Sequence, residues 1–129
     1  ALLLLQRNGT VTICHSGTKD LKAQTLQAGW AARGVAFSDS PARLISVVLH
    51  DRFSDTENTL FVGHVGVLLP VEDGSFCLVE KVAFQEPYRL GKVQNRAELR
   101  DYLMAKYDTS WGQDTTRPFI MENDSLMAE

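Results

Sequence analysis

The sequence lacks several features that mark specialised classes of protein. No apolar run approaches the ~20 residues that a membrane-spanning helix needs. Its 13 basic and 16 acidic residues are well mixed and give a net charge of −3, so no basic stripe is available for nucleic acid. No internal repeat and no low-complexity stretch is present. These absences argue against a nucleic-acid-binding protein, a repeat protein and a chain with a transmembrane segment.

Cysteine is also scarce. The chain has two, Cys14 and Cys77, which are too few for a disulfide framework. No Cys-x-x-Cys pair provides the spacing of metal ligands. We therefore predict neither a metal site nor a cofactor, and we expect Cys77 to be a small buried hydrophobic residue on a strand.

The composition is sufficient for one globular domain with a core, because 44% of the 129 residues are hydrophobic and 22% are charged. The apolar segment at residues 1–5 is typical of the end of a buried helix, and no initiator methionine precedes it. It is too short for the core of a signal peptide. We expect the chain to be the C-terminal part of a larger domain that is truncated at its N-terminus.

Two helices are predicted from the apolar spacing. Leu21, Leu26 and Trp30 predict a helix over residues 19–32. Asn95, with Glu98 three residues later, is a capping-box start for the second helix. The apolar face of that helix is formed by Leu99, Tyr102, Leu103 and Tyr107.

Several sequential strands accompany these helices. This order predicts an α+β domain with a largely antiparallel sheet, not alternating βαβ units. Strands are expected at residues 10–14, 44–49, 88–93 and 118–121, with a hairpin over 59–84 and a charged loop over 51–58.

The most informative segment is this hairpin, which carries His64 on its first strand and Glu80 on its second. The turn at residues 72–74, Glu-Asp-Gly, suits a three-residue loop with its glycine in the left-handed region. That loop places Val82 opposite His64 and Glu80 one same-face step away, at roughly 7–8 Å between backbones and within reach of a glutamate side chain. A two-residue turn would instead move Glu80 to the other face.

A carboxylate beside an imidazole has a known chemical use. It fixes the tautomer of the histidine and stabilises the imidazolium once the ring takes a proton from a nucleophile. His64 is then a candidate general base that Glu80 orients. The alternative is a half-buried strand histidine with Glu80 as its surface neighbour. Gly63 and Gly66 flank His64 and leave room for a substrate, or for tight packing of a core helix.

Cys14 is a second candidate nucleophile within the chain. A polar loop follows it, whereas an apolar helix starting at the cysteine would help to lower the pKa of the thiol. A semi-buried structural thiol is the competing interpretation of Cys14.

The remaining polar and aromatic residues have simpler explanations. His50 and Asp51 are expected at a solvated strand end, since two ligands make no metal site. Trp30 and Trp111 could line a groove, but core packing is the default for tryptophan in a small domain. The acidic residues expected on the solvated surface are Asp108, Asp114, Glu122, Asp124 and Glu129.

The histidine, the turn and the glutamate resemble the corresponding hairpin of the cysteine, histidine-dependent amidohydrolase/peptidase (CHAP) domains and their NlpC-type relatives. Those domains are compact papain-like cysteine hydrolases. The resemblance implies a papain-like fold, His64 as the base and Glu80 as the orienting residue. Gln85 matches loosely the position of a further polar group in such sites.

A wider resemblance covers most of the chain and is carried by residues 63–68, 79–88, 102–104 and 121–124. Its most specific part is the Glu-Lys-Val-Ala-Phe-Gln-Glu-Pro-Tyr run at 80–88. These segments resemble an uncharacterised bacterial domain of unknown function, often carried by secreted or lipid-anchored proteins. The resemblance implies an extracytoplasmic bacterial protein.

In that family a cysteine opens an apolar helix upstream of the hairpin. Residues 1–5 resemble this helix just after its cysteine, so the nucleophile is expected upstream of residue 1 and this chain alone is expected to be inactive. The implied function is a cysteine amidase or peptidase with a peptide or cell-envelope substrate. The alternative is a non-catalytic binding or scaffold domain on the same fold.

Overall fold

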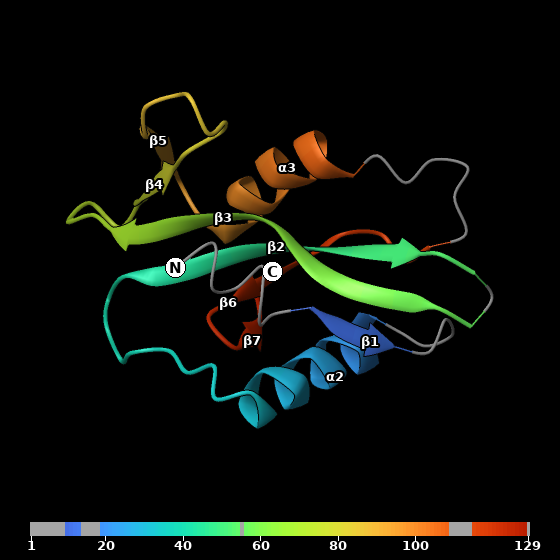
Figure 1. Ribbon diagram of the computed structural model, residues 1–129. Helices are drawn as coiled ribbons and strands as arrows, with labels where there is room; N and C mark the ends of the chain where they lie inside the picture. Colours follow the sequence, from blue (N-terminus) through green and yellow to red (C-terminus); the bar gives the residue numbers. More distant parts are fainter. Residues whose placement is uncertain (1–9, 14–18, 55, 109–114, 129) are drawn as a thin grey trace.

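The computed structural model describes residues 10–13, 19–54, 56–108 and 115–128 of the chain. Within these residues a twisted antiparallel sheet carries one helix on each of its faces (Figure 1). The elements are β1 (Val11–Ile13), α2 (Lys19–Ala32), β2 (Arg43–Arg52), β3 (Asn58–Pro70), β4 (Phe76–Glu80), β5 (Arg89–Val93), α3 (Arg96–Tyr107), β6 (Phe119–Glu122) and β7 (Ser125–Leu126).

The sheet has seven strands, and six of them follow the order β5-β4-β3-β2-β6-β7. The short β1 pairs with the start of β3. Every pairing between described strands is antiparallel. The α+β class with an antiparallel sheet is therefore confirmed.

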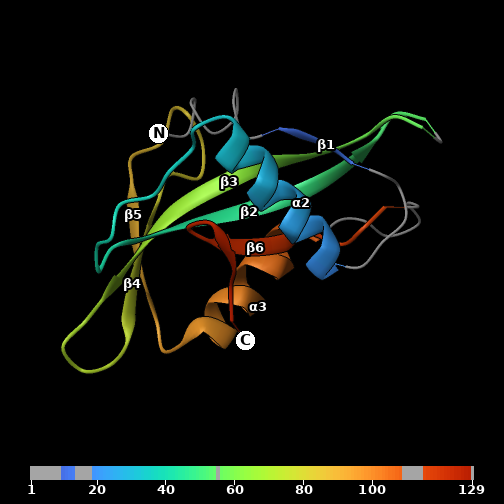
Figure 2. The same ribbon diagram turned by 90° about the horizontal axis from the view of Figure 1, so that it is seen from below.

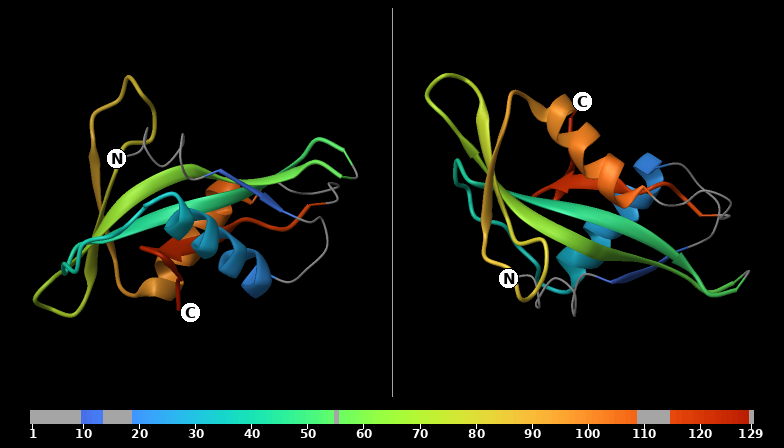
Figure 3. Two further views of the ribbon diagram at one scale, coloured as in Figure 1. Left: turned by 60° about the horizontal axis from the view of Figure 1, so that its bottom comes forward. Right: turned by 90° about the horizontal axis from the view of Figure 1, so that it is seen from above.

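Each helix covers its own core. α2 lies on the face that is seen from below, whereas α3 lies on the face that is seen from above (Figures 2 and 3). Leu26 and Trp30 of α2 pack in a cluster with Val48, Leu60 and other buried residues of the sheet. The core beneath α3 contains Leu99, Leu103, Ile45, Val47, Leu68, Leu78 and Ile120.

The long strand β3 contributes to both cores because it contains a bulge. Its register with β2 shifts where Val47 pairs with His64 and Val48 pairs with Val62, which leaves Gly63 as the extra residue. Val62 belongs to the core beneath α2, whereas Leu68 belongs to the core beneath α3. The bulge therefore reverses the side-chain alternation, and His64 lies on the α3 face.

A side chain at this bulge would displace Leu49 of the neighbouring strand. A Cβ atom at Gly63 would lie 2.4 Å from Cδ1 of Leu49, a distance that real Cβ atoms do not adopt. The predicted need for room at Gly63 is thus explained by the packing of β2.

The helix predicted at residues 19–32 agrees with α2, but its apolar face differs from the expectation. Leu21 is 55% exposed, whereas the neighbouring Lys22 is buried. Leu26 and Trp30 are buried as expected, and the Trp30 ring packs 5.8 Å from that of Phe37. Core packing of Trp30 is confirmed, while Trp111 lies outside the described residues.

The start of α3 confirms the predicted cap. Oδ1 of Asn95 accepts a hydrogen bond of 2.9 Å from the backbone N–H of Glu98. The carboxylate of Glu98 accepts in turn from the N–H of Gln94 at 3.0 Å. The reciprocal bond is therefore one residue earlier than in a standard capping box.

Two expectations about the strands are corrected. β2 continues through Asp51 and Arg52, which pair with Thr59 and Asn58 of β3, so the charged loop begins later than predicted. Cys77 is half-buried instead of fully buried.

The apolar segment at residues 1–5 lies outside the described residues. Neither of the described helices is long and apolar enough to cross a bilayer.

Candidate functional site

The hairpin that carries the candidate site closes as its turn sequence predicts. The N–H of Val71 donates to the carbonyl of Ser75 at 2.9 Å, and that of Gly74 donates to Val71 at 3.0 Å. Gly74 has a φ of 87°, in the left-handed region that favours glycine. The strands then pair Gly66 with Glu80, which confirms the predicted register.

His64 and Glu80 form a nearly buried pair. Nε2 of His64 lies 2.8 Å from Oε1 of Glu80. The two residues are only 7% and 5% exposed. The predicted contact across the hairpin is therefore confirmed, whereas the catalytic roles of the two residues remain a prediction.

Helix α3 adds two tyrosines to this pair. The Tyr102 hydroxyl donates to Oε2 of Glu80 at 2.6 Å, so each oxygen of the carboxylate has its own partner. The ring of Tyr107 stacks on that of His64, with 5.0 Å between centroids and 22° between planes. Helical spacing placed both tyrosines on the apolar face, but their partners depend on how α3 crosses the sheet.

Arg89 of β5 completes the surroundings of the carboxylate. One guanidinium nitrogen donates to the Tyr102 hydroxyl at 2.8 Å and lies 3.9 Å from Oε2 of Glu80. The Arg89 side chain is 54% exposed, so its charge is partly screened by water. The hydrogen bonds of His64 and Tyr102 therefore hold Glu80 more firmly than this ion pair does.

Two pKa values in the cluster depart from their ordinary ranges. Burial alone would raise the pKa of Glu80, but the hydrogen bonds from Tyr102 and His64, with the nearby charge of Lys106, lower it overall. Burial raises the pKa of Tyr107, and the charge of Glu80 adds to that effect. At neutral pH the cluster thus contains an ionised Glu80 and a neutral Tyr107 phenol.

Gly66 makes room for this arrangement. It is paired directly with Glu80 across the hairpin. A Cβ atom on Gly66 would lie 3.0 Å from Cδ1 of Leu78 and 3.6 Å from Cβ of Glu80. The room predicted beside His64 is therefore occupied by side chains of the partner strand β4.

The other sequence candidates do not join the pair. Cys14 lies outside the described residues. Cys77 neighbours Leu78 on β4, so its side chain points to the face opposite Glu80. Gln85 is exposed in the turn after β4, and within the described part of the chain no hydrogen bond or ion pair joins it to His64 or Glu80.

His50 is not at the solvated strand end that the sequence predicts. Its Nε2 lies 2.8 Å from Oδ1 of Asn58, and the N–H of Thr116 donates to its Nδ1 at 2.8 Å. Both ring nitrogens are therefore engaged in a polar cluster that joins β2, β3 and the segment before β6. The prediction failed because β2 extends past His50.

Glu122 is a second buried carboxylate, and its prediction as solvated surface is wrong. It is 8% exposed and binds Arg96 through bonds of 2.7 and 2.9 Å and Arg43 through a bond of 3.0 Å. The hydrogen bond from Arg96 is the main cause of its lowered pKa.

Among the other acidic residues expected on the surface, Asp108 is ion-paired, since Nε of Arg117 donates to it at 2.7 Å. Asp124 is exposed as expected, and Asp114 and Glu129 lie outside the described residues.

The described residues contain no group of three or more histidine, cysteine, aspartate or glutamate side chains that could hold a metal ion. The cluster around His64 offers acid–base groups and hydrogen-bond donors through its imidazole, carboxylate and phenol side chains. A nearly buried imidazole with an ionised carboxylate on one nitrogen can accept a proton on the other.

Comparisons with known proteins give one long match and several short ones. The bifunctional protein FolD of Polaromonas sp. (strain JS666 / ATCC BAA-500) is 79% identical over 28 residues. That of Janthinobacterium sp. (strain Marseille) is 75% identical over the same length. Each match covers 22% of this chain and spans only 10% of the FolD protein. No solved structure matches the chain.

The long match is to a family rather than to a single protein. The domain of unknown function DUF4300 matches residues 10–127, a range that includes both strands of the hairpin and both helices. The chain therefore belongs to the DUF4300 family.

Proposed function

We propose that this domain provides the acid–base residues of a papain-like cysteine amidase or peptidase, with His64 as the base and Glu80 as its positioning residue. The observation that carries the proposal is the 2.8 Å contact between Nε2 of His64 and Oε1 of Glu80 in a nearly buried setting. The resemblance of the hairpin to CHAP and NlpC-type domains supplies the reaction class. It also supplies the substrate class, a peptide or cell-envelope amide, and an extracytoplasmic location.

The chemistry follows from the tautomer of His64. An ionised Glu80 can only accept a hydrogen bond, so Nε2 carries the hydrogen and Nδ1 holds the lone pair. Nδ1 takes the proton of a thiol, and the thiolate attacks the amide carbonyl. When the carbon–nitrogen bond breaks, the proton on Nδ1 passes to the leaving amine. His64 then takes a proton from the water that hydrolyses the thioester and returns it to the thiol.

The thiol has to come from outside the described residues, because Cys77 points to the opposite face of the hairpin. It is either Cys14 or, as the resemblance favours, a cysteine of the parent protein that precedes residue 1 of this sequence. In the second case the chain alone binds no acyl group, and activity requires the parent protein.

A non-catalytic binding or scaffold domain is the second candidate function. The stacking of Tyr107 on the His64 ring favours it, because the tyrosine covers one side of the imidazole. In such a domain the pair would serve to hold β3, β4 and α3 together.

The test is labelling of the parent protein with a thiol-reactive amide probe. His64→Ala should abolish labelling, and Glu80→Gln should slow it and move the acid limb of its pH–rate profile to lower pH, because the imidazolium loses its carboxylate partner. His50→Gln is the matched control, since both ring nitrogens of that histidine are already engaged, and it should label like the unmodified protein. Unchanged labelling of a folded His64→Ala variant would refute the hydrolase and favour the scaffold.

A further inference from the structure

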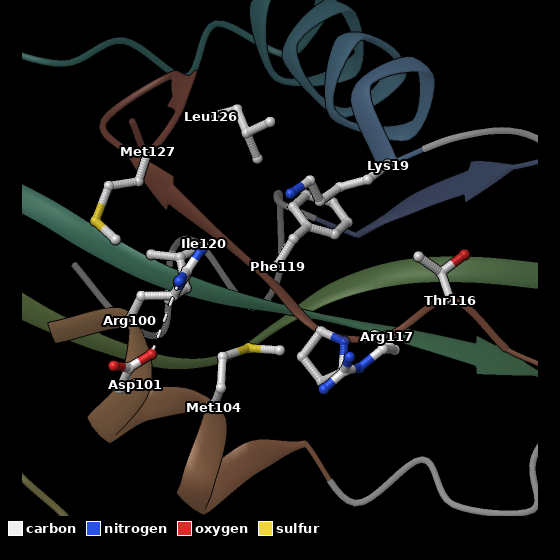
Figure 4. Close-up of a pocket in the computed structure, with 11 residues that line it drawn as sticks. Lys19, Arg100, Asp101, Met104, Thr116, Arg117, Phe119, Ile120, Leu126 and Met127 are labelled. Atoms are coloured by element: carbon white, nitrogen blue, oxygen red, sulfur yellow. Dashed lines mark ion pairs between the residues drawn. The ribbon is translucent and has the colours of Figure 1, made fainter. Parts of the chain in front are cut away.

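The two edges of the sheet differ in how they are protected. The edge strand β7 has only two residues, and Leu126 on it is half-buried beside a pocket of about 670 Å³ that residues of α3, β6 and β7 line (Figure 4). The edge strand β5 has five residues, and the first four are exposed. Among the described strands only β4 pairs with β5, so the outer side of β5 is open to a further strand.

Apolar side chains gather at the β5 edge. Leu90 is 74% exposed, and Phe84 and Tyr88 in the segment before β5 are 90% and 71% exposed. Nζ of Lys81 lies 5.5 Å from the centroids of both aromatic rings, which keeps the two rings near one another. Large apolar side chains that are grouped on the surface in this way mark an interaction site.

The two charges of β5 do not protect this edge, because each is ion-paired within the chain. Nζ of Lys92 lies 2.9 Å from Oδ2 of Asp73. The guanidinium of Arg89 lies 3.9 Å from Oε2 of Glu80. Proline and β-bulges also block the pairing of edge strands, and residues 89–93 contain neither. The edge therefore has no device that excludes a second strand.

The geometry of antiparallel pairing limits how two copies of β5 can meet. Successive residues of an edge strand direct their backbone N–H and C=O groups alternately inward and outward, and opposed residues direct them alike. When two identical strands pair about a two-fold axis, this rule places one residue opposite its own counterpart. Arg89 or Lys92 on the axis would oppose like charges, and Gly91 would contribute no side chain. Leu90 on the axis brings two apolar side chains together.

With Leu90 on the axis, the other residues of the edge complement one another. Tyr88 would lie opposite Lys92 of the second copy, on the same face as Leu90, where its ring suits the side chain of the cation. Arg89 would lie opposite Gly91 of the second copy. A Cβ atom at Gly91 would meet no atom within 4 Å, so this position leaves room for the guanidinium. Both contacts would occur twice, because the interface is symmetric.

We propose that a second copy of this chain docks on the β5 edge, so that two β5 strands pair antiparallel about Leu90 and join two sheets into one. Phe84 and Tyr88 together offer roughly 300 Å² of aromatic surface per copy, beside the main chain of the strand. This area is at the low end for a specific interface, so the dimer is weak, with a dissociation constant between roughly 1 µM and 1 mM. The pairing does not depend on the function of His64, which lies on β3, two strands away.

The test is sedimentation velocity of the full chain from about 1 µM to about 1 mM, over which the unmodified chain should pass from monomer to dimer. Leu90→Lys and Leu90→Glu each place like charges on the axis and should weaken the dimer at least about tenfold. An equimolar mixture of the two variants places opposite charges there and should recover most of the lost affinity. Phe53→Lys is the matched control, because Phe53 is 68% exposed but follows β2, and it should dimerise like the unmodified chain.

The side chain of Leu90 is largely exposed, so both variants should fold, which circular dichroism verifies. If either does not fold, amide hydrogen exchange of the unmodified chain decides, because residues 89–92 should exchange more slowly at about 1 mM than at about 1 µM. A chain that stays monomeric at about 1 mM would leave this edge to a different partner and overturn the proposal. A dimer that Leu90→Lys leaves unchanged, or a mixture of the two charged variants that stays monomeric, would overturn it as well.

Discussion

Glu80 and Glu122 are two buried carboxylates on different strands of the same sheet, and each receives a side chain from α3. They are 5% and 8% exposed. Glu122 binds two arginines, Arg43 and Arg96, whose charges are permanent. Glu80 binds the imidazole of His64 and the phenol hydroxyl of Tyr102. Similar burial therefore accompanies two kinds of partner, two permanent cations at Glu122 and an imidazole with a phenol hydroxyl at Glu80.

The distinction bears on the meaning of a buried charge. Both carboxylates have lowered pKa values, so the direction of the shift alone does not separate a structural site from a chemical one. What separates them is the kind of partner. Glu122 binds two arginines, which keep their protons, whereas Glu80 binds an imidazole, the side chain most often used in acid–base catalysis.

The largest effect is expected from breaking the cluster at Glu122. Glu122→Ala leaves Arg43 and Arg96 without their shared carboxylate and should lower the free energy of unfolding by about 3 kcal/mol. Urea denaturation followed by circular dichroism measures this loss. The control is Asp124→Ala, an exposed neighbour that should change stability by less than about 0.5 kcal/mol. Equal stabilities of the two variants would show that Glu122 is not a structural centre.

A smaller effect is expected at Glu80. Tyr102→Phe removes one hydrogen bond from Glu80 and should lower the free energy of unfolding by about 1 kcal/mol at neutral pH. Tyr88→Phe is the matched control, because Tyr88, the residue just before β5, is 71% exposed. If both variants lose the same stability in urea, the Tyr102 bond contributes nothing specific.

The smallest effect is expected in the acid part of the stability curve. Because the pKa values of Glu80 and Glu122 are below the usual value of 4.5, the folded state binds fewer protons than the unfolded state in that range. Their contribution is present above pH 4.5 and is lost as the pH falls through the lowered values. Glu80→Gln and Glu122→Gln should each flatten the decline of unfolding free energy between pH 5 and 3, measured by urea titration at each pH. A steeper decline in either variant would contradict the sign of the shift.

Local rules predicted the parts of the fold that depend on neighbours in sequence. The turn at residues 72–74 fixed the register of β3 with β4 and so brought His64 to Glu80. The cap at Asn95 placed the start of α3 correctly. Each of these follows from the conformation of a few adjacent residues, which the sequence encodes directly.

The parts that sequence reasoning missed depend on contacts between distant segments. Glu122 was expected in solvent because its partners, Arg43 and Arg96, come from β2 and α3. Tyr102 was assigned to an apolar face because nothing near it in sequence indicates Glu80. A buried charge becomes visible only when its counter-charge is placed in space.

The bulge at Gly63 changes which face of the sheet the even-numbered side chains of β3 point to. Upstream of it, even-numbered residues of β3 such as Val62 point to one helix, and downstream of it His64 and Leu68 point to the other. The chemistry of the imidazole is thus set by the presence of one residue without a side chain. In a strand that paired residue 63 regularly, the uninterrupted alternation would point His64 to the same helix as Val62, into the layer of Trp30.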